Sequence, residues 1–271
     1  METFKSSIAK EKILIATSGI FILLSLWWVI IFLMGVTDDP VNHIFGFVYG
    51  GFSLWGGIWG LLVARKWGGF SSLMGKAIYF LAFGLLAQAF GQYSFWYYNY
   101  VLRIAVPYPG IPDIGYFGTI PFYMYAAYLL FKTSGAKFSL NTIMSKIQAF
   151  IIPTIMVVIA YFLILKQYEF DLTDPLGTFL NFGYPLGQAV YISIAILTYL
   201  LSRKMLGGIM RFPILLIVIS FAAQFLADYV FIYYHDLYFP ASFMDYFYLL
   251  AYFLMTVSLI YLKVVADQLR N

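Results

Sequence analysis

The sequence predicts an all-α integral membrane protein built from eight transmembrane helices. Of its 271 residues, 63% are apolar and only 10% are charged, and the mean hydropathy is +0.86. Because soluble domains carry about 25% charged residues, this composition excludes a soluble domain, a disordered tail and a nucleic-acid-binding module. The length accommodates about eight apolar runs of roughly 20 residues joined by short loops.

Eight apolar runs bounded by charge, proline or glycine can be placed along the chain. They cover residues 13–35, 44–64, 77–100, 114–131, 147–166, 177–202, 211–234 and 243–264. The first run follows Lys5, Lys10 and Lys12 and lacks a small-residue cleavage site, so we expect a retained span and not a signal peptide. Glycines of the second run, such as Gly56 and Gly60, are typical of close helix packing.

The fourth and eighth runs each begin beside an aspartate that follows a proline-containing loop, Asp113 and Asp245. In the first turn of a helix an acid accepts hydrogen bonds from free backbone amides and opposes the helix dipole. Capping is therefore predicted for both residues, with ligand contact as the alternative. Pro121, Pro153 and Pro185 lie inside the fourth, fifth and sixth runs, where they could kink the helices, although proline is tolerated in membrane helices generally.

Basic and acidic residues sort to opposite ends of the predicted helices, which is further evidence for a membrane protein. Fourteen of the sixteen basic residues fall at one set of ends: Lys5, Lys10, Lys12, Arg65, Lys66, Lys76, Lys132, Lys137, Lys146, Arg203, Lys204, Arg211, Lys263 and Arg270. The other ends hold Arg103 and Lys166 and most of the acids: Asp38, Asp39, Asp113, Glu169, Asp171, Asp174, Asp236 and Asp245. The positive-inside rule then places both termini in the cytoplasm, and we expect a prokaryotic cytoplasmic membrane. The net charge of +4 therefore reflects orientation and not an acidic partner.

The chain is predicted to be a tandem repeat of two four-helix halves, residues 1–138 and 139–271. Residues 87–99 align without a gap with residues 223–235, sharing Ala, Gln, Tyr, Phe and a Tyr-Tyr pair at an offset of 136. Further matches, in the same order, are Asp39-Pro40 with Asp174-Pro175, Tyr49 with Tyr184, Arg65-Lys66 with Arg203-Lys204, and Asp113 and Tyr116 with Asp245 and Tyr248. The alternative is chance matching between aromatic-rich segments. Four helices per half give both halves the same orientation, so we expect a pseudo-two-fold axis along the membrane normal and a site between the halves.

Polar side chains inside the spans follow two equivalent stripes. The residues are Gln88, Gln92 and Asn99 in the third span and Gln224, Asp228 and His235 in the seventh. At about 100° per residue, each trio stays on one helix face and runs from near mid-membrane to the outer surface. The stripes predict a polar wall that opens outward.

Asp228 is the only acid placed well inside a span. No Lys or Arg lies at that depth, so its expected partners are Gln, Tyr or a bound ligand. An intramembrane acid indicates function by default. The alternative is a helix-to-helix hydrogen bond that only specifies packing.

Aromatic residues are abundant, with 24 Tyr, 28 Phe and 6 Trp. A belt at the headgroup level accounts for much of this excess. Rings on the polar stripe could also line a pocket for an amphipathic or cationic ligand. We expect Tyr93, Trp96, Tyr184 and Tyr229 to form its walls.

The residues and motifs that several kinds of catalysis and cofactor binding require are absent from the sequence. The chain has no Cys, which excludes a disulfide, a thiolate nucleophile and a Cys-based metal site. Lys263 lies at a helix end and cannot form a mid-membrane Schiff base, and the two histidines, His43 and His235, are too few for bis-His haem ligation. No G-x-S-x-G, H-E-x-x-H or phosphate-loop motif is present. No catalytic or metal-binding residue and no cofactor are predicted, and we expect a protein that is not an enzyme.

Four motifs together resemble an eight-helix membrane module. They are residues 107–116 (PYPGIPDIGY), Tyr184-Pro185-Leu186-Gly187, Ala227-Asp228-Tyr229 and Asp245-Tyr246-Phe247-Tyr248. That module lies at the N-terminus of many bacterial diguanylate cyclases, cyclic-di-GMP phosphodiesterases and histidine kinases. The resemblance covers nearly the whole chain and implies a sensory input module. Gln92 stands where the module often has an acid, and the chain ends at Asn271 without a signalling domain, so we expect a cytoplasmic signalling partner or a homodimer.

A weaker similarity is to lysoplasmalogenase-like membrane hydrolases, which also have eight helices and acids in the third and seventh. Gln92 replaces the first of those acids, and the second span has no internal lysine. Vinyl-ether hydrolysis is therefore the least favoured hypothesis.

The leading hypothesis is a multi-pass receptor or ligand-binding module that holds a small or lipid-like ligand between its halves. Its polar contacts would be Gln88, Gln92, Gln224 and Asp228, and Asp113 and Asp245 would lie near the mouth of the pocket. The alternative is a small transporter in which the halves rock about the same site and Asp228 carries protons.

Overall fold

The computed structural model describes residues 11–37, 39–134, 142–201 and 208–270, and these residues form eight helices apolar and long enough to cross a membrane. The protein is therefore an all-helical, multi-pass membrane protein in contact with the lipid bilayer. The helices are α2 (Lys12–Met34), α3 (Pro40–Lys66), α4 (Leu73–Trp96), α5 (Ile111–Thr133), α7 (Ile143–Leu163), α8 (Pro175–Leu201), α9 (Arg211–Tyr234) and α10 (Phe243–Arg270). Short 3₁₀ turns are η1 (Gly69–Ser71), η3 (Leu165–Gln167) and η5 (His235–Leu237), and η2 (Tyr97–Leu102) is a π-helical turn that continues α4.

Side chains at the first turns explain where several helices begin. Asp39 accepts a hydrogen bond from the Val41 amide at 2.9 Å, and Ser72 accepts one from the Gly75 amide at 2.8 Å. Asp174 plays the same part for α8, accepting from the Gly177 amide at 3.0 Å. Each cap satisfies a backbone amide that has no partner within its helix.

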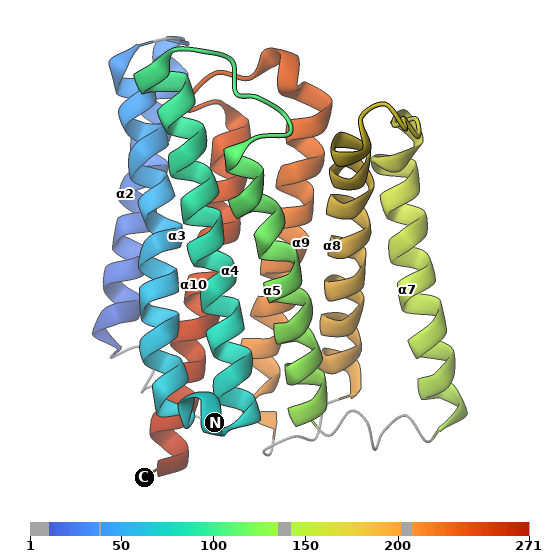
Figure 1. The fold of residues 1–271 in the computed structure, drawn as a ribbon. Helices are drawn as coiled ribbons and strands as arrows, with labels where there is room; N and C mark the ends of the chain where they lie inside the picture. Colours follow the sequence, from blue (N-terminus) through green and yellow to red (C-terminus); the bar gives the residue numbers. More distant parts are fainter. Residues whose placement is uncertain (1–10, 38, 135–141, 202–207, 271) are drawn as a thin grey trace.

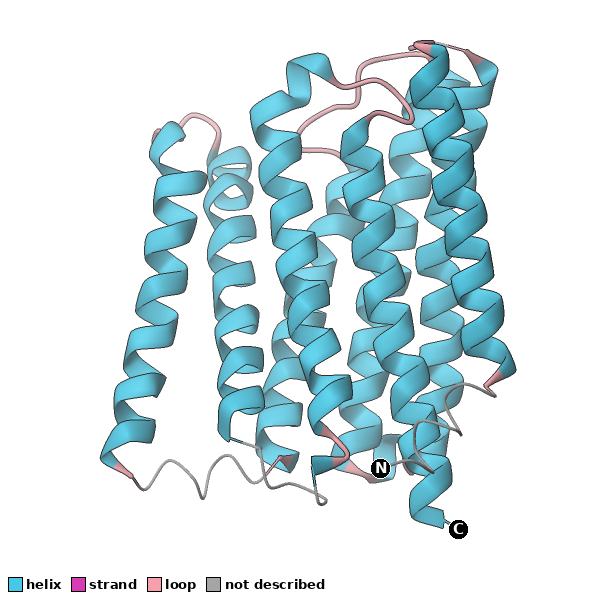
Figure 2. Cartoon of the chain, turned by 180° about the vertical axis from the view of Figure 1, so that it is seen from behind, coloured by secondary structure: helices cyan, strands magenta, loops and turns pink. Residues whose placement is uncertain are grey.

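Six helices form a closed ring. Around it, α3 packs on α4, α4 on α5, α5 on α8, α8 on α9, α9 on α10, and α10 on α3 again (Figures 1 and 2). Outside the ring, α2 packs against α10 and α3, while α7 packs mainly against α8. The interior of the ring is consequently lined by helices from both halves of the chain.

The helices alternate in direction, so charged residues gather at two ends of the bundle, as the sequence predicts (Figure 1). We call one the basic end: it holds Lys12, Arg65, Lys66, Lys76, Lys132, Lys146, Arg211, Lys263 and Arg270. The other, the acidic end, holds Asp39, Asp113, Glu169, Asp171, Asp174, Asp236 and Asp245, with Arg103 and Lys166. Lys5, Lys10, Asp38, Lys137, Arg203 and Lys204 lie outside the described residues.

The largest shift of a single helix end is at α10, which continues to Arg270 and not to residue 264. Charges in its last turns were expected to end the span, but they form ion pairs beside it. Lys263 Nζ lies 2.6 Å from Glu11 Oε2, and Lys66 Nζ lies 2.6 Å from Asp267 Oδ1.

Glycines bring α4 and α5 close enough for tyrosine rings to fill the space. A Cβ atom at Gly84 would lie 2.1 Å from the Tyr123 ring, and one at Gly91 would lie 2.6 Å from the Tyr116 ring. The two glycines are seven residues apart on α4, about two helical turns, and so are the two tyrosines on α5. The rings therefore pack one above the other along the helix contact. On α3, a Cβ at Gly60 would lie 2.7 Å from Ala82 Cβ of α4, in agreement with the packing expected of this helix.

Candidate functional site

Asp228, on α9, is the centre of a polar cluster inside the ring. One carboxylate oxygen accepts a hydrogen bond from the Tyr248 hydroxyl at 2.6 Å, and the other accepts one from Gln188 Nε2. Gln224 Nε2, one turn earlier on α9, lies 3.3 Å from the carboxylate. Its partners are thus two glutamines and a tyrosine, as the sequence predicts, and they come from α8, α9 and α10.

The first half of the chain contains a matching pair. The Tyr116 hydroxyl of α5 donates to Gln92 Oε1 of α4 at 3.0 Å. Gln92 corresponds to Asp228 in the predicted repeat, and Tyr116 corresponds to Tyr248. Equivalent tyrosines of the predicted repeat therefore contact an amide in one half and a carboxylate in the other.

Two further equivalent pairs cross from one half to the other. Tyr49 on α3 donates to Asp245 Oδ1 on α10 at 2.9 Å, and Tyr184 on α8 donates to Asp113 Oδ1 on α5, also at 2.9 Å. The second oxygen of each aspartate caps its own helix. Asp113 Oδ2 accepts from the Gly110 amide and Asp245 Oδ2 from the Ala241 amide, each at 2.8 Å. Each aspartate caps a helix and joins the two halves at once.

These cross-half pairs predict equal effects from two substitutions. Tyr49→Phe and Tyr184→Phe each remove one hydrogen bond to a carboxylate, so each is expected to lower the free energy of unfolding by about 1–2 kcal/mol. Equilibrium unfolding in detergent micelles measures the change. Tyr128→Phe is the control, because this lipid-facing side chain is 49% exposed. A loss in only one of the two variants would contradict their equivalence.

The glutamine side chains of both stripes are buried. Gln88, Gln92 and Gln224 are 3%, 4% and 5% exposed, and Gln88 Oε1 accepts a hydrogen bond from Tyr252 of α10 at 3.2 Å. Asp228 and Tyr248 are partly exposed. The cluster lies inside the helix ring, and the outward opening of the polar wall stays a prediction.

Three aromatic rings pack together on the acidic-end side of the site, where Phe231 lies 6.5 Å from the ring of Tyr248. Phe95 of α4 and Phe231 of α9 meet edge to face with centroids 6.3 Å apart, and Tyr238 lies 5.5 Å from each of them. Burial raises the pKa of the Tyr238 hydroxyl well above its usual value, so this group stays protonated and donates to Asp245 Oδ1 at 3.4 Å. We call these three residues the aromatic cap.

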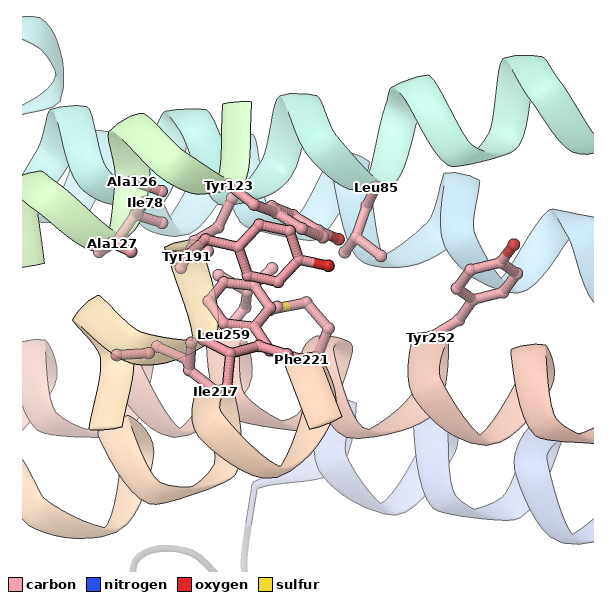
Figure 3. Packing of buried hydrophobic residues seen from close by; sticks show 14 of the residues in the cluster. Ile78, Leu85, Tyr123, Ala126, Ala127, Tyr191, Ile217, Phe221, Tyr252 and Leu259 are labelled. Carbon is pink, nitrogen blue, oxygen red and sulfur yellow. The ribbon is translucent and has the colours of Figure 1, made fainter. Parts of the chain in front are cut away.

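Apolar packing closes the site toward the basic end. Figure 3 shows Ile78, Ala126, Ala127, Ile217 and Leu259 gathered there, and all five are fully buried. They come from α4, α5, α9 and α10, which approach each other on this side of the tyrosines.

Three polar groups near this apolar packing make no hydrogen bond to any described residue, and one of them, Gln188 Oε1, is a fully buried atom. The hydroxyls of Tyr123 and Tyr191 make no hydrogen bond to any described residue, although the side chains are 3% and 1% exposed. In Figure 3 both rings point away from Ala126 and Ala127, toward the side on which Tyr252 lies. Gln188 and Tyr191 are one turn apart on α8, and the rings of Tyr191 and Tyr123 lie 5.7 Å apart.

Several predicted site residues lie away from this cluster. The predicted helix turns into the π-helical η2 after Trp96, so Asn99 leaves the polar stripe and donates to Phe95 O. His235 falls in the 3₁₀ turn η5 and contacts its neighbour Asp236, with 62% of its side chain exposed. Both stripes are therefore shorter than predicted, because the α-helical period of 100° per residue ends before their last members.

Of the predicted aromatic walls, Tyr184 is the one whose hydroxyl bonds to another predicted site residue, Asp113. Tyr93 and Trp96 pack on Phe47 at the α3–α4 contact, with ring centroids 5.0 and 4.9 Å away. Tyr229 packs on Tyr233 of its own helix at 4.6 Å. These three rings belong to helix contacts near the acidic end and are not joined to Asp228.

Gln188 is the main residue that sequence reasoning missed. It is the one glutamine inside the sixth apolar run, and an isolated amide in a membrane span is a usable signal for a buried polar contact. Tyr123, Tyr191 and Tyr252 could not be separated from the aromatic belt, because their depth and rotation depend on helix packing.

The site offers hydrogen-bond donors and acceptors and one carboxylate. Within the described ranges, no group of three or more His, Cys, Asp or Glu residues could hold a metal ion. Comparisons with protein-family models, curated proteins and solved structures found no match to this chain. The chemistry of the site therefore carries the functional inference alone.

Proposed function

We propose that this protein is a membrane receptor, a sensory ligand-binding module that holds a small polar or amphipathic molecule beside Asp228. The acidic end would face outward and both termini the cytoplasm, as the positive-inside rule requires. Output would pass to a cytoplasmic signalling partner or through a homodimer, in keeping with the resemblance to sensory input modules.

The observation that carries this proposal is the set of unpaired groups, Gln188 Oε1 and the hydroxyls of Tyr123 and Tyr191. A buried polar atom without a partner, as Gln188 Oε1 is, costs about 1–3 kcal/mol. Together with two tyrosine hydroxyls close by that make no hydrogen bond to a described residue, it favours a bound molecule that satisfies all three. Such a molecule would donate to Gln188 Oε1 and exchange hydrogen bonds with the two hydroxyls. Its apolar part would rest on the tyrosine rings and on Phe221, which lies 4.5 Å from Tyr191.

The packing on both sides of the site favours sensing over transport. The aromatic cap packs on its acidic-end side, and the buried apolar residues around Ile217 and Leu259 pack on its basic-end side. A ligand would enter by displacing the rings of the cap. Binding would then change the packing of Phe95 and Phe231, which belong to different halves.

The contacts between halves support the predicted repeat. Phe95 and Phe231, which meet in the aromatic cap, occupy equivalent positions 136 residues apart. Residues related by a two-fold axis touch each other only near that axis. The α3–α10 contact and the α5–α8 contact are likewise equivalent in a four-plus-four arrangement. We therefore propose parallel pseudo-two-fold symmetry with its axis passing through the site.

The proposal is tested by searching for the molecule and for transport with the same variants. Protein extracted in mild detergent is examined by native mass spectrometry for a retained small molecule, with Asp228→Asn compared against the wild type. Both are also placed in proteoliposomes containing a pH-sensitive dye, with a pH gradient and small-molecule extracts outside. Binding without proton flux supports the receptor.

Other outcomes overturn it. Proton flux that Asp228→Asn abolishes would establish the proton-coupled transporter instead. No retained molecule and no flux, with only a lower melting temperature for Asp228→Asn, would leave Asp228 a packing residue.

Tyr191→Phe is a more selective probe of the same site. It removes one unpaired hydroxyl, so the free energy of unfolding of the ligand-free protein is expected to stay constant or rise by about 1 kcal/mol. Retention of the bound molecule is expected to fall. Unfolding in micelles and native mass spectrometry measure the two quantities. Destabilisation of the ligand-free protein would mean that the hydroxyl has a partner within the protein.

A further inference from the structure

A cavity of about 470 Å³ lies at the acidic end, and none of the residues around Asp228 lines it. It is formed where α3 begins and where the chain leaves η2, and Pro40, His43, Asn99, Tyr100 and Arg103 line it. Ligand pockets commonly have volumes of about 300–1,000 Å³. The cavity therefore has the size of a binding site for a small group.

Arg103 is the source of positive charge in this cavity. This exposed side chain forms no ion pair or hydrogen bond with any residue that the structure describes. At the acidic end, Lys166 is the other basic residue within the described ranges. A free guanidinium offers five N–H donors in a planar fork that suits the oxygens of a phosphate.

The backbone conformation at Arg103 favours a functional role for its side chain. Its φ of 54° and ψ of 43° lie in the left-handed region, and its amide donates to Tyr98 O to end η2. Glycine is the usual residue at such a helix end, because a side chain there is strained. An arginine at this position favours a role for the guanidinium outside backbone geometry.

The walls around Arg103 are held by packing. The Tyr100 ring lies 4.9 Å from the His43 ring and 5.2 Å from the Trp96 ring. Trp96 Nε1 donates to His43 O at 2.8 Å, which ties the end of α4 to the start of α3. One carboxylate, that of Asp39, lies next to Pro40 and is engaged in capping α3.

From this cavity, its unpaired arginine and its aromatic walls, we propose that the acidic end binds a phosphate group, with Arg103 as the main contact. Aromatic side chains of this kind lie at the headgroup level of membranes, where the phosphates of lipids are also found. The group could therefore belong to an anionic phospholipid or to a free phosphate. This site is independent of the ligand proposed beside Asp228.

The test measures binding of two probes to the purified full chain. Binding of dioleoylphosphatidylglycerol is titrated by native mass spectrometry. Binding of inorganic phosphate is measured as the rise in melting temperature relative to chloride at the same ionic strength. Arg103→Gly removes the cation while suiting the left-handed backbone, and it is expected to weaken binding by about tenfold, the loss of a charged hydrogen-bonded contact. Arg103→Lys is expected to lose part of the affinity, since a point charge replaces the fork.

Lys166→Gln is the matched control, because it removes the other basic residue at this end and should bind as the wild type does. A response to the lipid alone, to phosphate alone or to both supports the phosphate site and identifies its source. The proposal is overturned if the wild type binds neither probe, if Arg103→Gly binds both as well as the wild type, or if Lys166→Gln loses as much affinity. The melting temperature of each variant without probe verifies that it is folded.

Discussion

Asp228→Ala is expected to be the most destabilising single polar substitution in this protein, lowering the free energy of unfolding by about 3–5 kcal/mol. The change removes the acceptor shared by three side chains, Gln188, Gln224 and Tyr248. Their donors would remain buried inside the helix ring without partners, and each unpaired group costs about 1–3 kcal/mol. Asp228→Asn keeps one oxygen and is expected to cost about 1–2 kcal/mol, because its NH₂ group faces donors.

Equilibrium unfolding in mixed detergent micelles measures these losses. Gln92→Ala is the matched control at the equivalent position of α4, where a single hydrogen bond from Tyr116 is lost. Its expected cost is about 1–2 kcal/mol. If Asp228→Ala costs no more than Gln92→Ala, the carboxylate does not organise the cluster as the geometry indicates.

Gly115→Ala is expected to be strongly disruptive, with a loss of about 3 kcal/mol. A Cβ at Gly115 would lie 2.4 Å from the Gly91 amide nitrogen and 2.5 Å from Ala87 O, both backbone atoms of α4. Backbone atoms of a packed helix cannot turn aside as a flexible side chain can. Helices α4 and α5 would have to separate, and Tyr116 would shift from its bond with Gln92.

Gly118→Ala is the control within the same helix, because a Cβ there meets nothing within 4 Å. It is expected to be neutral or to stabilise the protein by up to about 1 kcal/mol, since alanine favours helix more than glycine does. Unfolding in micelles again measures both variants. Equal stabilities would contradict the tight α4–α5 contact.

The fold could be predicted in large part because its signals are local. Each span is a run of apolar residues that must satisfy its own backbone hydrogen bonds in lipid, so length and hydropathy alone locate it. The eight spans, the sorting of charge to two ends and the capping by Asp113 and Asp245 follow from short stretches of sequence. The structure confirms these predictions. The repeat and the orientation of the termini stay predictions.

The candidate site was less predictable. Gln88, Gln92, Gln224 and Asp228 were expected to face the interior, and the structure buries the glutamines there. The last residues of both stripes were misplaced because η2 and η5 depart from the α-helical period. Local periodicity gives the face of a helix only while the helix remains regular.

The sequence by itself determined that the chain crosses a membrane with eight helices, and that one acid lies among amides and tyrosines at depth. Only the tertiary structure decided that Gln188 from α8 meets Asp228, that Tyr123 and Tyr191 lack partners, and that an aromatic cap packs beside the site. The physical reason is that a membrane span depends on the summed hydropathy of neighbouring residues, which the sequence gives directly. A site depends on which helices pack together and on how each is rotated, and these are contacts between residues far apart in the chain.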